Sequence, residues 1–173
     1  YEGDFRLNHL WVATVATGTA TKLTSGAFTV RGTPSWSPDG TRLAFDASPT
    51  PMIRDERRDA YVVDVASQRI DRITTSHDVQ STPQFAPDGK TVYFLSAKSG
   101  SMQLWSQAID AKAATQISRF DLDVGAYKIS PDGKSVALSF EVFNDCADLA
   151  CSRKRYDEKA ASKASGQLYD KLF

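Results

Sequence analysis

Few side chains in this sequence could do chemistry, and they are spread along it. The chain has two histidines, His9 and His77, and two cysteines, Cys146 and Cys151. His77 stands beside Asp78, a pair that could orient a general base, but no plausible nucleophile accompanies it. The sequence contains no Gly-x-Ser-x-Gly elbow, no glycine-rich phosphate loop and no zinc motif. We therefore assign no catalytic residue, no metal ligand and no cofactor.

The two cysteines are five residues apart and do not form a Cys-x-x-Cys pair, which weakens redox and zinc interpretations. Two interpretations remain, a local disulfide formed in an oxidising compartment and two free thiols, and we favour the disulfide between Cys146 and Cys151. Because the loop is short, such a bond gains little from chain entropy. Its role would be to fix the shape of the surrounding segment.

The histidines and cysteines lie within a chain that is organised by a repeat containing Pro-Asp-Gly. The tripeptide occurs at residues 38–40, 87–89 and 131–133, each time two positions after an aromatic or aliphatic residue and before an apolar alternation. Proline suits the second position of a type I turn, aspartate suits the third, and glycine adopts the positive φ that rejoins the strand. Each copy therefore predicts a β-hairpin.

The repeat extends beyond this turn. Successive prolines of the tripeptide are 49 and 44 residues apart. In each unit an aromatic residue also stands 13 residues before a Thr or Ser, at Trp11 and Thr24, Tyr61 and Thr74, and Trp105 and Ser118. A period of 40 to 50 residues with four short strands per unit is typical of a β-propeller. An all-β domain that merely reuses a favoured turn would not keep several landmarks in register.

We predict an all-β fold, a partial β-propeller of about three to four blades of four-stranded antiparallel sheet. The whole chain, 1–173, would be one incomplete propeller domain, with blade boundaries near 1–31, 32–80, 81–123 and 124–173. A segment rich in Lys, Arg, Ala and Glu predicts a short helical insertion near 152–165. Propellers typically have four to eight blades, and the chain lacks an initiator Met. We therefore expect an internal piece of a longer protein.

Strand alternation sorts the loops of such a propeller onto two faces. One face receives the tight turns. The other receives the irregular segments at 47–59, 76–79 and 120–124 and an insertion from Glu141 to about residue 167. Since function concentrates in loops on a rigid scaffold, we expect the site on this second face. The tryptophans and Phe45, Phe85 and Phe94 are assigned to the core.

Composition excludes some classes of function. Lys and Arg total 21 and Asp and Glu total 21, so the formal charge of zero gives no support for nucleic-acid or membrane-surface binding. No apolar run approaches the roughly 18 residues of a transmembrane helix. The carboxylates on the irregular face are Asp78, Asp121, Asp123, Glu141 and Asp145, and turn capping or solubility explains each of them singly.

The repeat carries a family resemblance. Residues 36–45, Trp-Ser-Pro-Asp-Gly-x-x-Leu-Ala-Phe, with the strand at 61–65 and its Ile-Thr close, resemble two groups of proteins. One is the N-terminal propeller of the prolyl oligopeptidase family, in its dipeptidyl-peptidase and acylaminoacyl-peptidase branch. The other is the periplasmic propeller protein of the Tol system. The last third, at 123–133, 141–151 and 169–173, is similar to bacterial secreted members of the peptidase family.

The peptidase resemblance implies a periplasmic or secreted serine exopeptidase whose propeller gates access to a separate α/β-hydrolase domain. The family's Ser-Asp-His triad has no counterpart in this chain, so no catalytic residue is carried over. The implied partners are a peptide substrate, the remainder of the propeller and the hydrolase domain. Glu141, with Asp145, is then the candidate that binds the peptide's ammonium group, unless Glu141 is only a surface residue that ends a strand. The Tol resemblance implies instead a module that binds protein partners without chemistry.

Overall fold

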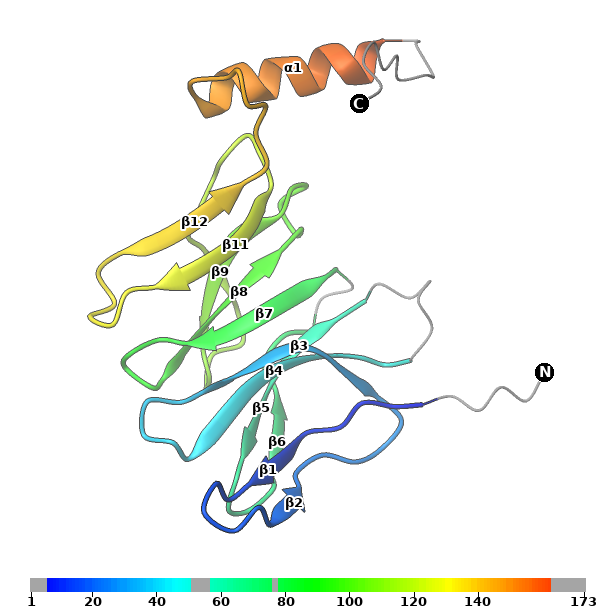
Figure 1. The fold of residues 1–173 in the computed structure, drawn as a ribbon, viewed down its shortest axis with the longest axis vertical. Coiled ribbons are helices and arrows are strands. Elements are labelled where there is room, and N and C mark those ends of the chain that lie inside the picture. The colour runs from blue at the N-terminus through cyan, green and yellow to red at the C-terminus, as the bar shows by residue number, and fades with distance from the viewer. Residues whose placement is uncertain (1–5, 51–56, 76–77, 163–173) are drawn as a thin grey trace, which may run out of the picture.

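The protein is described here by a computed structural model that covers residues 6–50, 57–75 and 78–162. Four antiparallel sheets follow one another along the chain, and one helix comes last (Figure 1). This is the predicted partial β-propeller. Among the described residues no helix is long and apolar enough to cross a membrane.

The first sheet pairs two short strands, and the second has four strands in chain order. The first contains β1 (Trp11–Ala13) and β2 (Ala20–Lys22). The second contains β3 (Thr29–Trp36), β4 (Arg42–Ser48), β5 (Asp59–Asp64) and β6 (Ile70–Arg72).

The third sheet repeats the second, and the fourth again has two strands. The third contains β7 (Gln80–Phe85), β8 (Thr91–Ser96), β9 (Gln103–Ala108) and β10 (Thr115–Gln116). The fourth pairs β11 (Val124–Ile129) with β12 (Val136–Phe140).

The helix α1 (Leu149–Ala161) follows β12 and lies beyond the sheets, at the top of Figure 1. It begins three residues before the predicted start, because Asp148 caps it: the side chain accepts a hydrogen bond from the Cys151 N–H at 2.8 Å. The last predicted helical residues, 163–165, lie outside the described part of the chain.

The three Pro-Asp-Gly turns join β3 to β4, β7 to β8 and β11 to β12, as the sequence predicted. Their glycines have φ of 70°, 65° and 71°. In the first turn the Ser37 hydroxyl donates to Asp39 Oδ1 at 2.6 Å, and the Thr41 N–H donates to the same oxygen at 3.1 Å. The hydrogen bond from Ser37, with those from Thr41, lowers the pKa of Asp39 to about 2. The turn aspartates are therefore structural.

A buried hydroxyl explains the spacing of 13 residues between the aromatic and the Thr or Ser. Thr24 Oγ1 accepts the Leu10 N–H at 2.9 Å, and Thr74 Oγ1 accepts the Ala60 N–H at 2.9 Å. Ser118 Oγ accepts the Leu104 N–H at 2.8 Å. In each unit the donor is the residue directly before the repeated aromatic. The hydroxyl thus joins the end of the fourth strand to the third strand.

Hydrophobic cores lie between consecutive sheets, so the blades stack face to face as expected. The first core joins residues of β1–β2 and their flanks to β3–β5. The second joins the β3–β6 sheet to Phe85 and Val92. The third joins Leu95 and Leu104 to Val124 and Tyr127. The Tyr127 hydroxyl lies 2.7 Å from the carbonyl oxygens of Thr82 and Tyr93, which links the last two sheets.

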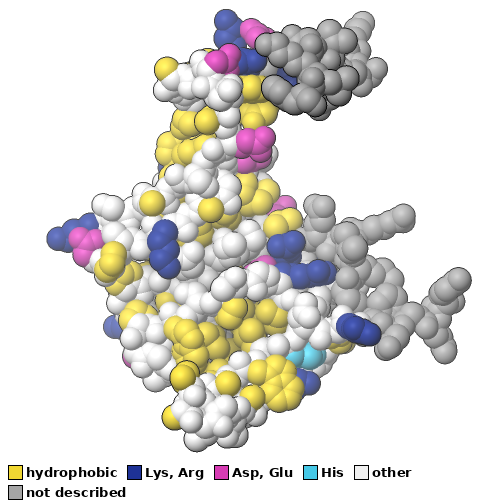
Figure 2. Space-filling model, in the orientation of Figure 1, with side chains coloured by type: hydrophobic (Ala, Val, Ile, Leu, Met, Phe, Trp, Pro, Cys, Tyr) yellow, Lys and Arg dark blue, Asp and Glu magenta, His cyan; other side chains and the backbone are white. Residues whose placement is uncertain are grey.

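Two tryptophans are exposed, which corrects their assignment to the core. Trp11 is 59% exposed and Trp36 is 49% exposed, whereas Trp105 is buried. Trp11 alternates with the packed Val12 and so faces away from the first core. Trp36 pairs with Leu43 and lies on the side that faces the two-stranded first sheet. In the described part of the chain this first sheet does not extend over Trp36. Figure 2 shows hydrophobic side chains gathered over this lower part of the molecule.

The first strand of each hairpin is interrupted. Register shifts fall between Arg31 and Ser35 in β3, between Ser81 and Gln84 in β7, and at the start of β11. Gly32 has a φ of 57°, and Thr82 adopts a φ of 51° despite its branched side chain. These bulges bend the strand that forms one edge of each four-stranded sheet.

The buried hydroxyls make a testable contribution to stability. We expect Thr74→Val to lower the free energy of unfolding by about 1 to 3 kcal/mol, because the Ala60 N–H is left buried without an acceptor. Urea denaturation measures the change. Thr75→Val is the matched control, since Thr75 is exposed and adjacent, and it should change stability by less than about 0.5 kcal/mol. Equal midpoints for the two variants would contradict the role of this hydroxyl.

Candidate functional site

The predicted binding residue Glu141 directly follows β12 and lines a pocket of about 470 Å³. The pocket lies between α1 and the loops that follow β8 and β10. Its lining residues are Gly100, Ser101, Asp121, Leu122, Asp123, Glu141, Arg153, Tyr156 and Ala160. These loops belong to the irregular face, so the chain brings three of the five acids named from the sequence to one place.

The pocket is acidic. Among the described residues that line it are the carboxylates of Asp121, Asp123 and Glu141 but only one cation, Arg153. Figure 2 shows acidic side chains at the junction between the sheets and the helix. The Arg153 guanidinium already pairs with Asp157 on the next turn of α1, and it donates to the Asp121 carbonyl oxygen at 3.3 Å. Its charge is therefore largely matched, and the pocket keeps an excess of negative charge.

The carboxylates in the pocket differ in the hydrogen bonds that they already accept. Asp123 Oδ1 accepts the Met102 N–H at 2.6 Å, so this carboxylate helps to hold the loop before β9. Glu141 is exposed and lies near Tyr156. Desolvation raises the pKa of the Tyr156 hydroxyl, and the charge of the Glu141 carboxylate and the hydrogen bond to it raise this pKa further. Glu141 therefore has a partner, the Tyr156 hydroxyl, and its carboxylate keeps further acceptor sites for a positively charged group.

The arrangement favours a cation held by hydrogen bonds. Among the described residues no group of three or more His, Cys, Asp and Glu side chains is arranged to hold a metal ion. An ammonium group, by contrast, has three donors that separate carboxylate and carbonyl oxygens can accept. The pocket could therefore bind a primary amine.

The helix that forms one wall is fixed to the end of β12 by packing. The buried Ser152 Oγ accepts the Phe143 N–H at 3.1 Å. The Phe143 and Tyr156 rings have centroids 4.8 Å apart, and the Arg155 guanidinium lies 4.3 Å from the centroid of Phe143. These contacts place Tyr156 and Arg153 at the pocket.

A disulfide joins Cys146 to Cys151 across the loop that enters α1, with Cα atoms 5.5 Å apart. Asp145 precedes it and pairs with Arg155. The structure thus places Glu141 in the pocket but Asp145 outside it, so the two predicted binding residues are not brought together. The carboxylate of Asp145 is engaged by the helix instead.

The histidines form no site in the described residues. His77 lies outside them, and its neighbour Asp78 is exposed. His9 Nδ1 lies 3.3 Å from Thr24 Oγ1, and its ring contacts Phe28 edge-on. Partial burial lowers the pKa of His9. This histidine takes part in packing.

One acid that the sequence reasoning missed is Asp46 in β4. It is fully buried, and neither carboxylate oxygen makes a hydrogen bond of normal geometry to a described residue. Arg58 Nη1 lies 3.7 Å from Asp46 Oδ2. Burial raises the pKa of Asp46 to about 6, although the charge of Arg58 opposes this. A signal existed: at the same distance after the repeated proline, the other hairpins have Leu95 and Ser139.

The comparisons with known proteins agree with this architecture. A family model described as the TolB β-propeller domain matches residues 5–159. The chain belongs to the TolB-type β-propeller family. TolB from Acinetobacter baumannii has a TM-score of 0.65 at 26% identity, over 77% of this chain and 32% of that one.

Peptidases are also among the relatives of this TolB-type propeller. Dipeptidyl-peptidase 5 from Porphyromonas gingivalis is 27% identical over 124 residues, which is 71% of this chain and 18% of the relative. A puromycin-hydrolyzing peptidase from Mycobacterium tuberculosis has a TM-score of 0.58 at 17% identity, over 70% of this chain and 20% of that one, a likeness that shows the fold alone.

An uncharacterized protein from Agrobacterium fabrum is 32% identical over 117 residues, 66% of this chain and 38% of the relative. The chain therefore spans well under half the length of these curated relatives. As a propeller it is related both to TolB and to the propeller domains of peptidases.

The cysteines can be tested chemically. We expect intact mass spectrometry of the full-length protein, purified from an oxidising compartment, to show alkylation at Cys146 and Cys151 only after reduction. Their Cα separation suits a disulfide without movement of the backbone. Two thiols that alkylate without reductant would contradict the bond.

Asp46 gives a prediction for the pH dependence of stability. The folded protein holds the Asp46 proton up to a pKa of about 6, whereas an unfolded chain loses it near 3.9. Stability should therefore fall as pH rises from about 4 to about 6, by about 3 kcal/mol. We expect Asp46→Asn to lack this fall in urea denaturation between pH 4 and pH 7. The exposed Asp110→Asn is the control, and identical profiles for wild type and Asp46→Asn would contradict the assignment.

Proposed function

We propose that this propeller is the access-controlling part of a periplasmic or secreted bacterial serine exopeptidase, of the dipeptidyl- or acylaminoacyl-peptidase type. In this proposal the catalytic groups lie on a separate α/β-hydrolase domain, and the propeller binds the amino end of the peptide. The observation that carries the proposal is the acidic pocket with Glu141, together with the similarity to dipeptidyl-peptidase 5 over 71% of the chain.

The pocket suits the task chemically. An exopeptidase that acts at the amino terminus must distinguish a free ammonium from an acylated nitrogen. A carboxylate makes charge-assisted hydrogen bonds to the ammonium and none of comparable strength to an amide. Glu141 is exposed in the free protein, so it is available to a ligand, and bound peptide would desolvate the pair and strengthen it.

A second candidate function is that of a Tol-type propeller that binds protein partners without chemistry. Its support is the similarity to TolB from Acinetobacter baumannii, with a TM-score of 0.65 against 0.58 for the Mycobacterium tuberculosis peptidase. In that case the irregular face, including α1, would contact a protein and not the end of a peptide.

The peptidase proposal predicts a selective loss on removing one charge. In the full-length protein, Glu141→Gln should lower kcat/KM about 10- to 150-fold for a substrate with a free amino terminus, since a hydrogen bond to a charged group contributes about 1.5 to 3 kcal/mol. The N-acylated form of the same peptide should be affected much less. Rates on the two substrates measure the difference.

Two variants control for loss of structure. Asp145→Asn removes an acid that is bound to Arg155 outside the pocket, and Glu158→Gln removes one that pairs with Lys154 on α1. Both should keep the preference for a free amine. Equal effects of Glu141→Gln on both substrates would contradict the role of Glu141. A full-length protein that cleaves neither substrate would instead favour the Tol-type function.

A further inference from the structure

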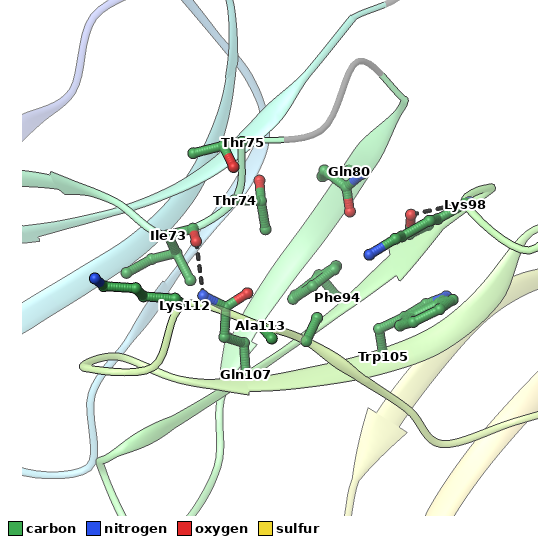
Figure 3. A pocket seen from close by; sticks show the side chains of 12 residues that line it. Ile73, Thr74, Thr75, Gln80, Phe94, Lys98, Trp105, Gln107, Lys112 and Ala113 are labelled. Atoms are coloured by element: carbon green, nitrogen blue, oxygen red, sulfur yellow. Dashed lines mark hydrogen bonds between the residues drawn. The ribbon is translucent and has the colours of Figure 1, made fainter.

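A second pocket, of opposite charge, lies between the β3–β6 sheet and the β7–β10 sheet. Its volume is about 280 Å³, and Figure 3 shows the side chains around it. It is lined by Ile73, Thr74, Thr75, Gln80, Phe94, Ser96, Lys98, Trp105, Gln107, Lys112, Ala113 and Ala114. Two of these side chains are lysines and none is acidic, so the pocket attracts anions.

The interface between the first two sheets contains an aromatic stack at the position that corresponds to this pocket. There Phe45 and Tyr61 are paired across β4 and β5, and their ring centroids are 5.5 Å apart. Phe28 stacks against both, with centroids at 6.4 Å and 6.0 Å. Three rings thus fill that interface.

In the next blade Phe94 and Trp105 are paired across β8 and β9 in the same way. Here the two rings line the pocket, and the third position of the stack is not taken by an aromatic ring among the residues that line it. A flat aromatic ligand would therefore find the surfaces against which Phe28 packs one blade earlier. Offset or edge-on contacts between rings are favourable beyond the area that they bury.

The polar groups of the pocket would bind a negatively charged oxygen. Lys98 Nζ lies 5.5 Å from the centroid of the Trp105 ring. The Trp105 Nε1–H is buried and has no hydrogen-bond acceptor among the residues that the structure describes, an uncommon state for a buried donor. In contrast, the Gln107 amide is satisfied, because it donates to the carbonyl oxygens of Ile73 and Ala111 at 2.8 Å each. The free donor and the ammonium thus belong to neighbouring side chains.

We propose that this pocket binds a small organic carboxylate that carries an aromatic ring. The ring packs against Phe94 and Trp105, and the carboxylate pairs with Lys98 Nζ and accepts the Trp105 Nε1–H. The volume, just below that of a typical pocket for a drug-sized ligand, sets the size of the ligand at one or two rings. This site is separate from the acidic pocket at Glu141 and does not depend on the function proposed there.

The test uses fluorine NMR of the full-length protein labelled with fluorotryptophan, with benzoate as the probe. Trp105 lies in the pocket, whereas Trp11 and Trp36 are exposed elsewhere and serve as internal references. Trp105→Tyr assigns the Trp105 signal and keeps a ring like that of Tyr61. If that variant does not fold, Trp105→Phe assigns the same signal.

Benzoate should move the Trp105 signal saturably, with a dissociation constant of about 1 to 10 mM for so small a ligand. Acetate lacks the ring and benzyl alcohol lacks the charge, so each should bind at least about fivefold more weakly. Lys98→Met keeps the length of the side chain without its charge and should weaken benzoate binding about fivefold or more. Lys90→Met, at an exposed turn, is the matched control.

Three results would overturn the proposal. Equal movement of the signals of Trp105, Trp11 and Trp36 would show a general solvent effect. Unchanged benzoate affinity in Lys98→Met would remove the charge pairing. Acetate or benzyl alcohol binding as tightly as benzoate would show that the pocket does not require the ring and the carboxylate together.

Discussion

Three of the four blades depend on one buried hydrogen bond that closes the unit. A Thr or Ser hydroxyl at the end of the fourth strand accepts a backbone N–H at the start of the third, at Thr24, Thr74 and Ser118. A buried N–H must find an acceptor, and the short fourth strand cannot supply one through its backbone at this point. The aromatic residue that follows the donor is thereby held at a fixed height in the blade. The stacked cores, and the loops that they carry, depend on that position.

This bond explains why the fold was readable from the sequence. The hydroxyl, the aromatic and the Pro-Asp-Gly turn are each local requirements, so they recur at spacings that a single sequence displays. Two exposed tryptophans were misjudged because exposure depends on what the neighbouring sheet covers, and Trp36 lies where the described part of the first sheet does not reach. The start of α1 was misplaced because the cap at Asp148 lies between the two cysteines and was treated as part of a loop.

The candidate sites were less predictable because they arise from differences between the repeats. Glu141 could be named from its place after a strand, but Asp145 could not be separated from it, since the ion pair with Arg155 depends on the course of the helix. Asp46 and the pocket beside Trp105 both occupy positions that another blade fills with different side chains. Aligning the units position by position reveals them as departures. The chemistry at each departure, however, depends on contacts between blades that no single repeat contains.

The register shifts in the first strands affect how the blades meet around the propeller axis. β3 and β7 are edge strands, and an unbroken edge offers a full row of donors and acceptors to any other strand. The bulges at Gly32 and Thr82 interrupt the regular spacing of the backbone donors and acceptors and bend part of each edge. A bulged edge is therefore a poorer template for pairing with another strand. At the bulge in β7 the Thr82 carbonyl oxygen accepts the Tyr127 hydroxyl of the next sheet, so the broken edge also serves as an anchor between two consecutive blades.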